Sequence, residues 1–196
     1  MWMLEQFQAA WIVFSKRPER PNPRDYQKNL FYSSGPMAIM RLRPTTDADL
    51  DFVVKAESDP DTSPFIIPWP RHRHAIALGD PDIAHRIAED EVQNPVGFVI
   101  LGGLTNPDSS VEFRRIVVAR KGLGYGRWIV RAVKELAFND LEAHRLWLDV
   151  KSHNARARAL YTSEGFSEEG VLRECIRGPV GFESLVVMAL LRHELR

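Results

Sequence analysis

A glycine-rich stretch, residues 120–127 with the sequence RKGLGYGR, constrains the fold of this chain more than any other feature. Gly122, Gly124 and Gly126 stand at alternate positions between a strand-like run, residues 112–118, and an amphipathic helical pattern. Glycines let a ligand approach the backbone, and the free N–H groups at a helix start favour an anion. The stretch therefore predicts a phosphate or pyrophosphate cradle, with a tight structural turn as the alternative.

The spacing of these glycines excludes two common nucleotide-binding loops. A Walker A loop needs Gly-Lys-Ser or Gly-Lys-Thr after four residues, and the chain has no such run. A dinucleotide fingerprint needs glycines at positions 1, 3 and 6. Counting from Gly122 or Gly124, the sixth position is Arg127 or Ile129.

A second pattern follows the dense strand-like run of residues 145–150. Asn154 and Tyr161 are seven residues apart, nearly two helical turns, so both face the same side of the predicted helix. Gly165 and Phe166 end that helix and restart an extended segment.

Together, the glycine-rich turn and the Asn154–Phe166 pattern resemble the GNAT superfamily of N-acetyltransferases, nearest to its ribosomal-protein-alanine and polyamine acetyltransferase branch. The resemblance covers about residues 37–192. It departs at Lys121, where the family commonly has Gln or Arg. Because the family's pyrophosphate contacts are mostly backbone N–H groups, we expect this departure to matter little.

The resemblance implies an α/β (α+β) fold with a mixed, mostly antiparallel central sheet and flanking helices, the acyl-CoA N-acyltransferase fold. Two parallel strands, residues 112–118 and 145–150, would splay apart around acetyl-CoA as cosubstrate. The pantetheine arm would pair with the backbone of one strand as an added strand, and Asn154 would bond to it. The cofactor-binding residues implied in the strand and turn are Ile116, Val117, Val118, Lys121, Gly122, Leu123, Gly124, Tyr125, Gly126 and Arg127.

The reaction implied is attack of a neutral amine on the thioester, in which the amine loses a proton and the thiolate gains one. Tyr161 is the candidate acid because its pKa of about 10 is near that of a thiol. A buried structural tyrosine is the alternative. Glu112 is the candidate base, with an ion-paired surface role as the alternative and Glu57, Asp59 or a water chain as rivals.

Acceptor selection is predicted for residues 61–74, a loop rich in proline and aromatic side chains. Phe65 and Trp69 are the candidate substrate-binding residues because they can wall a pocket. The basic run RHRH at the end of this loop either meets an acidic acceptor or peptide, or is a solvated loop. Its two histidines have no further ligand in evidence, so the sequence predicts no metal site.

Residues 1–36 differ from the rest in composition, with four of the 13 prolines and five basic side chains against three acidic ones. We predict an N-terminal arm over residues 1–36 and a GNAT acetyltransferase domain over residues 37–196. The arm is a docking arm or an upstream extension, or else it covers a partner. The elements expected are a short helix over 1–14, an edge strand over 39–43, a helix from the cap Thr46 to the stop at Pro60, a helix over 80–88, an antiparallel hairpin of strands 95–101 and 111–118, and a last strand over 181–191.

Composition bounds the partners and the compartment. The 26 basic and 26 acidic side chains give no net charge, which argues against a nucleic-acid partner. No apolar stretch reaches the roughly 18 residues of a membrane span, and no secretory signal leads the chain. The single cysteine, Cys175, suits a reducing compartment. We expect a cytoplasmic protein with no membrane partner; a homodimer through the apolar last strand stays open beside an ordinary last strand.

These patterns predict an acetyl-CoA-dependent N-acetyltransferase that acts on a primary amine by direct attack. The acceptor is a small molecule, such as a polyamine, an amino acid or an aminoglycoside, or it is a protein N-terminus. A non-catalytic acyl-CoA-binding or regulatory module is the alternative from another class. A transferase for another acyl group, such as succinyl, is a third reading.

Overall fold

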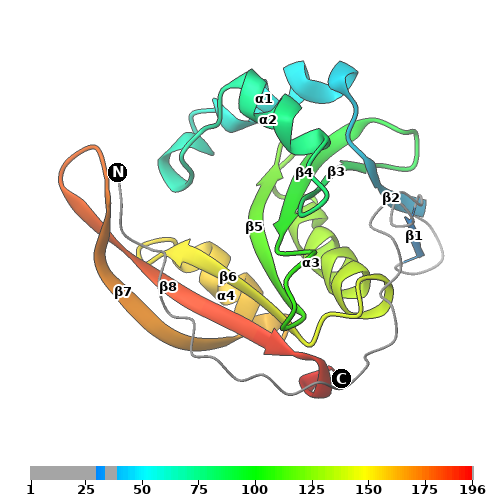
Figure 1. Cartoon of the computed structure of the whole chain (residues 1–196). Helices are drawn as coiled ribbons and strands as arrows, with labels where there is room; N and C mark the ends of the chain where they lie inside the picture. The colour runs from blue at the N-terminus through cyan, green and yellow to red at the C-terminus, as the bar shows by residue number, and fades with distance from the viewer. Residues whose placement is uncertain (1–29, 34–38, 196) are drawn as a thin grey trace.

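The β-strands of the described chain join one sheet, in a computed structural model that describes residues 30–33 and 39–195 (Figure 1). The order in this eight-stranded sheet is β1-β2-β3-β4-β5-β6-β8-β7. The strands are β1 (Leu30–Ser33), β2 (Ile39–Pro44), β3 (Ala84–Glu89), β4 (Pro95–Gly102), β5 (Ser110–Val118), β6 (Arg145–Lys151), β7 (Ser167–Arg177) and β8 (Phe182–Leu191). The helices are α1 (Leu50–Glu57), α2 (Arg71–Leu78), α3 (Tyr125–Glu135) and α4 (Ala155–Ser163).

Within the described sheet, β5 and β6 form the one parallel pair, and they separate soon after they begin to pair. Their register runs only from Ser110 opposite Arg145 to Glu112 opposite Trp147. Beyond that point β5 stays paired with β4 and β6 with β8, while the two strands diverge (Figure 1). The predicted mixed, mostly antiparallel sheet with two splayed parallel strands is confirmed.

Both faces of the sheet are covered at β4, and this strand shows how the sequence divides its side chains between them. Val99 and Leu101 pack in the cluster that contains the buried side of α3. Phe98 and Ile100 pack in a second cluster with residues of α1 and α2. Successive strand residues point to opposite faces, so a continuous apolar run is what a doubly covered strand requires.

The two helices that flank the cofactor motifs form as the sequence predicts. α3 starts directly after the glycine-rich turn and buries its apolar side, including Ile129 and Val133. α4 starts after its cap Asn154 and ends before Gly165, whose φ of 98° lies in the left-handed region that favours glycine.

Two expectations between α1 and β4 are wrong. Residues 84–89 form strand β3 rather than part of a helix over 80–88, and residues 71–78 form helix α2 rather than a loop. All six residues of β3 are buried although the strand contains charged side chains. Glu89 is satisfied there by ion pairs with Arg41 (2.5 Å) and Arg43 (2.6 Å) from β2. Because β2 supplies these partners, the charged residues of β3 can be buried in a strand. The sequence of β3 alone looks polar, which is why it predicts a helix.

The ends of the sheet also differ in part from expectation. Residues 30–33, within the predicted arm, form β1 and pair antiparallel with β2, so β2 is not an edge strand as expected. The predicted helix over residues 1–14 lies outside the described residues, and the division at residue 36 stays a prediction. β8 lies between β6 and β7, as an inner strand of the sheet. None of the described helices is both long and apolar enough to cross a membrane.

Candidate active site

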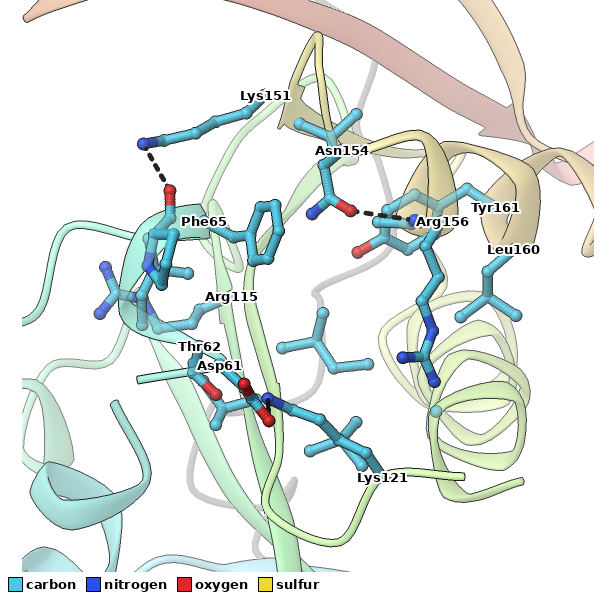
Figure 2. Close-up of a pocket in the computed structure, with 18 of the residues that line it drawn as sticks. Asp61, Thr62, Phe65, Arg115, Lys121, Lys151, Asn154, Arg156, Leu160 and Tyr161 are labelled. Atoms are coloured by element: carbon cyan, nitrogen blue, oxygen red, sulfur yellow. Dashed lines mark hydrogen bonds and ion pairs between the residues drawn. The ribbon is translucent and has the colours of Figure 1, made fainter. Parts of the chain in front are cut away.

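A cleft of about 1030 Å³ opens where β5 and β6 separate. Both strands line it, together with the glycine-rich turn, the start of α3, one side of α4 and the loop between α1 and α2 (Figure 2). Its volume is at the upper end of the range for small-molecule and cofactor sites. The cleft therefore brings together the turn and the α4 motif, which lie far apart in the sequence.

The glycine-rich turn forms one end of this cleft. Gly122 and Gly124 have φ angles of 84° and 82°, a left-handed backbone that glycine adopts readily. A Cβ built on either glycine meets no heavy atom within 4 Å. Neither glycine is thus required by protein packing, and the open space lies at the N-terminus of α3, which begins at Tyr125. The turn fits a phosphate group, since first-turn N–H groups have no partner inside a helix.

Most of the other predicted cofactor residues also line the cleft. Ile116, Val117 and Val118 lie on the part of β5 that no longer pairs with β6, so their backbone edge faces the opening. Val117 itself is buried, so it can offer a ligand its backbone but not its side chain. Leu123 is exposed and is not among the described residues that line the cleft.

The side chains at the start of α3 and in the turn already have partners. Arg127 lines the cleft, but its guanidinium donates to Glu164 (2.5 Å) and to Ser163. Lys121 lies 3.6 Å from Asp59 and 3.7 Å from a second carboxylate of the loop between α1 and α2. These pairings leave the backbone as the main anion-binding feature of the turn.

Asn154 and Tyr161 both line the cleft from α4, as their spacing predicts. The side-chain oxygen of Asn154 accepts a hydrogen bond from the backbone N–H of Ala157 at 3.2 Å and caps the helix. Its amide nitrogen faces the cleft (Figure 2). This residue therefore has the capping role and still offers a donor to a ligand.

Tyr161 is almost entirely buried, with ring contacts to Phe113 and Phe166. Burial and, second, the negative charge of Asp149 raise the pKa of its hydroxyl well above the ordinary value. Tyr161 is thus held protonated at neutral pH, but it is a weaker acid than an ordinary tyrosine, so its pKa no longer lies near that of a thiol as the sequence analysis assumed.

Two of the carboxylates that line the cleft lie on the central strands, and they differ in their partners. Glu112 pairs with Arg114 on the same strand (2.7 Å). Asp149, on β6, forms no ion pair with any Lys, Arg or His of the described residues. Asp149 is exposed to the open cleft, yet the protein around it and, second, the negative charge of Glu112 raise the pKa of its carboxyl. Asp149 therefore has the properties of a proton acceptor, and Glu112 those of an ion-paired neighbour.

The sequence analysis did not select Asp149, although a signal for it was present. In β6, Leu146, Leu148 and Val150 are buried and alternate with the polar positions Asp149 and Lys151. A period of two places these polar side chains on one face of the strand. That face is the one that opens onto the cleft.

The rival base Glu57 lies outside the cleft wall and is fully buried. It accepts hydrogen bonds from the backbone N–H of Trp69 (2.6 Å) and from Arg115, and His74 Nε2 lies 3.4 Å away. Burial opposes its charge, yet the nearby ring of His74 and the charge of Arg115 leave the pKa of Glu57 below its ordinary value. Glu57 is thus an ionised structural partner. Asp59, the other rival, faces Lys121.

The loop between α1 and α2 contributes one of its two predicted aromatic residues to the cleft. Phe65 lines the cleft and is 40% exposed. Trp69 is buried in the second core cluster, with Arg73 stacked 4.0 Å from its ring, and it is not among the described lining residues. The basic run at residues 71–74 begins helix α2 instead of lying in a loop; Arg71, His72 and Arg73 are exposed there, and His74 is buried.

Known proteins that resemble this chain include acetyltransferases. The model of the acetyltransferase (GNAT) family matches residues 50–166, more than half of the chain. The chain is 33% identical over 89 residues to a spermidine N(1)-acetyltransferase of Vibrio cholerae, which is 45% of this chain and 51% of that protein. It is 39% identical over 74 residues to the [ribosomal protein bS18]-alanine N-acetyltransferase of Escherichia coli K12, 36% of this chain and 46% of that protein. The chain thus spans about half the length of the curated relatives it matches.

Solved structures share the fold over a larger part of the chain. Spermidine N-acetyltransferase from Vibrio cholerae in complex with CoA and spermine has a TM-score of 0.71 and 25% identity, covering 79% of this chain and 96% of that one. A dodecameric structure of the same enzyme has a TM-score of 0.69 and 23% identity, covering 79% and 95%. With the family model matched over residues 50–166 and the sheet split at β5 and β6, the chain belongs to the acetyltransferase (GNAT) family.

Proposed function

We propose that the chain is an acetyl-CoA-dependent N-acetyltransferase that acts on a primary amine. One observation carries the proposal: an unpaired carboxylate, Asp149, and a buried hydroxyl, Tyr161, share the cleft where the parallel strands separate. A base and an acid on opposite sides of the reacting atoms are what amine acylation by a thioester needs.

Acetyl-CoA supplies the activated acetyl group as a thioester. The backbone N–H groups at the start of α3 would hold its pyrophosphate, with Gly122 and Gly124 leaving room for it. The free edge of β5 at residues 116–118 would pair with the pantetheine arm, and the amide of Asn154 would donate to it. This arrangement would put the thioester between the two strands, beside Asp149 and Tyr161.

Two proton transfers accompany the exchange of a C–S bond for a C–N bond. Asp149 takes the proton that the amine loses, directly or through a water molecule, and Tyr161 gives its proton to the departing thiolate. The charge of Asp149 is one cause of the raised pKa of Tyr161. Once Asp149 is protonated that charge is gone, and Tyr161 becomes a stronger acid. The coupling favours the order of base first and acid second.

The acceptor is proposed to be a small-molecule amine or the N-terminus of a peptide. The support comes from the relatives, which include a spermidine and a ribosomal-protein-alanine acetyltransferase, and from the spermine bound to a structural neighbour. In this chain, Asp149 supplies a negative charge that attracts an ammonium group before it is deprotonated.

The test is release of free thiol from acetyl-CoA across a panel of polyamines, amino acids, aminoglycosides and short peptides. Release with at least one amine, abolished by omitting that amine, is expected. Calorimetric binding of CoA without thiol release from any acceptor would sink the proposal and favour a non-catalytic acyl-CoA-binding module.

A further inference from the structure

We propose that Lys151 sets the width of the amine that reaches the thioester, by pinning the loop between α1 and α2 across the cleft. We call this loop, residues 58–70, the strap. The effect on amine selection rests on the proposed function, but the hydrogen bond that holds the strap is present in the structure whatever the chain acetylates. No catalytic step is assigned to Lys151.

The pin is a hydrogen bond between opposite walls of the cleft. Lys151, at the end of β6, donates from Nζ to the carbonyl oxygen of Pro64 at 2.9 Å (Figure 2). Its side chain is only 9% exposed, and its ammonium also pairs with Glu183 of β8 at 2.7 Å. Glu183 therefore fixes the ammonium on the β6 side, and the ammonium holds the tip of the strap.

The tip carries the aromatic side chain that faces the cleft. Phe65 follows Pro64 directly, and its ring lies 5.9 Å from that of His153, just after β6. The ring is thus held between the two walls (Figure 2). A fixed ring at this position limits how wide an acceptor can be when it approaches the space between β5 and β6.

The base of the strap is fixed independently of Lys151. Arg115 of β5 donates to the carbonyl oxygen of Ile67 at 2.8 Å, and the backbone N–H of Trp69 donates to buried Glu57. The strap therefore has a rigid base and a tip that depends on few contacts. Removing the Lys151 bond is expected to free the tip while the base stays in place.

A second link, between Lys121 and the strap, is weaker. Its nitrogen–oxygen distances are 3.6 and 3.7 Å, and the carboxylates of Asp59 and Asp61 are largely exposed. Exposed ion pairs contribute little, whereas a hydrogen bond from a charged donor shielded from water is among the stronger ones. Loss of the Lys151–Pro64 hydrogen bond should therefore loosen the strap more than loss of the Lys121 ion pairs.

The test compares two lysine substitutions that each remove a bond to a backbone carbonyl. Lys151→Met removes the pin and keeps the apolar stem. Lys134→Met is the matched control, since Lys134 donates to the carbonyl of Glu164 at 2.7 Å outside the cleft. Because Lys151→Met leaves the half-buried Glu183 without its partner, a double variant with Glu183→Gln removes the ion pair as a unit. Lys151→Arg keeps a cationic donor and serves as the conservative variant.

Two readouts separate this inference from the proposed function. The first is kcat/KM for a graded series of primary amines, from a linear diamine through a branched amino-acid amide to a short peptide. The preference for slim over wide amines is expected to fall at least about tenfold in Lys151→Met and in the double variant, about 1.4 kcal/mol. The preference should be unchanged in Lys134→Met and largely kept in Lys151→Arg. The KM for acetyl-CoA should stay the same throughout.

The second readout is amide hydrogen exchange at Phe65, whose backbone N–H donates to the carbonyl oxygen of Thr62 at 2.9 Å; it needs no activity. Faster exchange at the tip in Lys151→Met than in Lys134→Met, with Trp69 unchanged, supports the pin. Unchanged exchange at the tip, or an unchanged amine preference in an active Lys151→Met enzyme, overturns the inference. If no amine in the series is acetylated, the proposed function fails while the exchange rates still decide whether Lys151 pins the strap.

Discussion

Replacing Gly124 by alanine tests whether the glycine-rich turn exists for a ligand or only for its own backbone. Gly124 has a φ of 82°, and a Cβ there would meet no heavy atom within 4 Å. The left-handed backbone costs an L-residue about 1–2 kcal/mol. With no clash to add, this is the whole expected loss in the free energy of unfolding.

Gly165 offers a matched control. Its φ is 98°, and its added Cβ would lie at an ordinary contact distance, 3.6 Å from Leu190. It ends α4 and does not line the cleft. Gly124→Ala and Gly165→Ala should therefore lose nearly the same stability, measured by urea unfolding.

The two variants should differ in their affinity for CoA. A Cβ on Gly124 would stand in the space that we assign to the pyrophosphate, and a hydrogen bond to a charged group is worth about 1.5–3 kcal/mol. Loss of one such bond weakens binding roughly ten- to a hundredfold. Calorimetry should show this rise in Kd for Gly124→Ala and none for Gly165→Ala. Equal CoA affinity in the two variants, at equal stability, would refute the assignment of the turn to the phosphate.

Three further predictions follow from the charges and hydroxyl of the structure. Tyr161→Phe should lower kcat by at least about a hundredfold with little change in CoA affinity, because only the proton donor is lost; an unchanged kcat in a steady-state thiol assay removes Tyr161 from the mechanism. Activity should fall as pH drops through the raised pKa of Asp149. Glu112→Gln should move this acidic limb of the pH–rate profile to lower pH, because it removes the negative charge that helps to raise the pKa of Asp149. An acidic limb that does not move would contradict Asp149 as the base. Burial opposes the charge of Asp49, but hydrogen bonds from Arg43 and Thr46 lower its pKa to about 2. The stability that this carboxylate contributes should therefore be lost as pH falls from about 4 towards 2, and the loss should be smaller in Asp49→Asn. Equal acid sensitivity of the two proteins in thermal unfolding would count against this.

The parts of the site that depend on local geometry were predictable from the sequence. A glycine at a left-handed position, a helix that starts directly after it, and two side chains seven residues apart on one helix are all set within a few residues. The glycine-rich turn and Asn154 with Tyr161 therefore lie where the sequence predicts them, in one cleft.

The parts that depend on partners from distant segments were not predictable in this way. The composition of β3 is charged and resembles that of a helix. Its polar side chains are buried in a strand because distant residues pair with them: arginines of β2 with Glu89, and Thr45 (2.8 Å) and His74 (3.1 Å) with His85. Trp69 lies in a loop whose aromatic composition suggests a pocket wall, but its side chain packs in the core, with the Arg115 guanidinium over its ring. Nothing within the segments themselves carries these pairings.

Asp149 is an intermediate case, because alternation along β6 places it on the cleft face while its lack of a cationic partner needs the folded surroundings. A sequence can therefore show that a carboxylate faces a cleft. Its readiness to take a proton depends on which charges the fold brings near it.

The early end of the β5–β6 pairing makes the sheet two sheets in mechanical terms, one of five strands and one of three, joined over three paired positions. Past Glu112 and Trp147, each strand keeps an inner edge that no other described strand pairs with. At the rim of a molecule such an edge invites another chain to add to it. Here the edges line a cleft that the strap also borders, a space that suits a slender ligand better than a second protein. The same gap that admits a cofactor thus keeps two sheet edges away from aggregation.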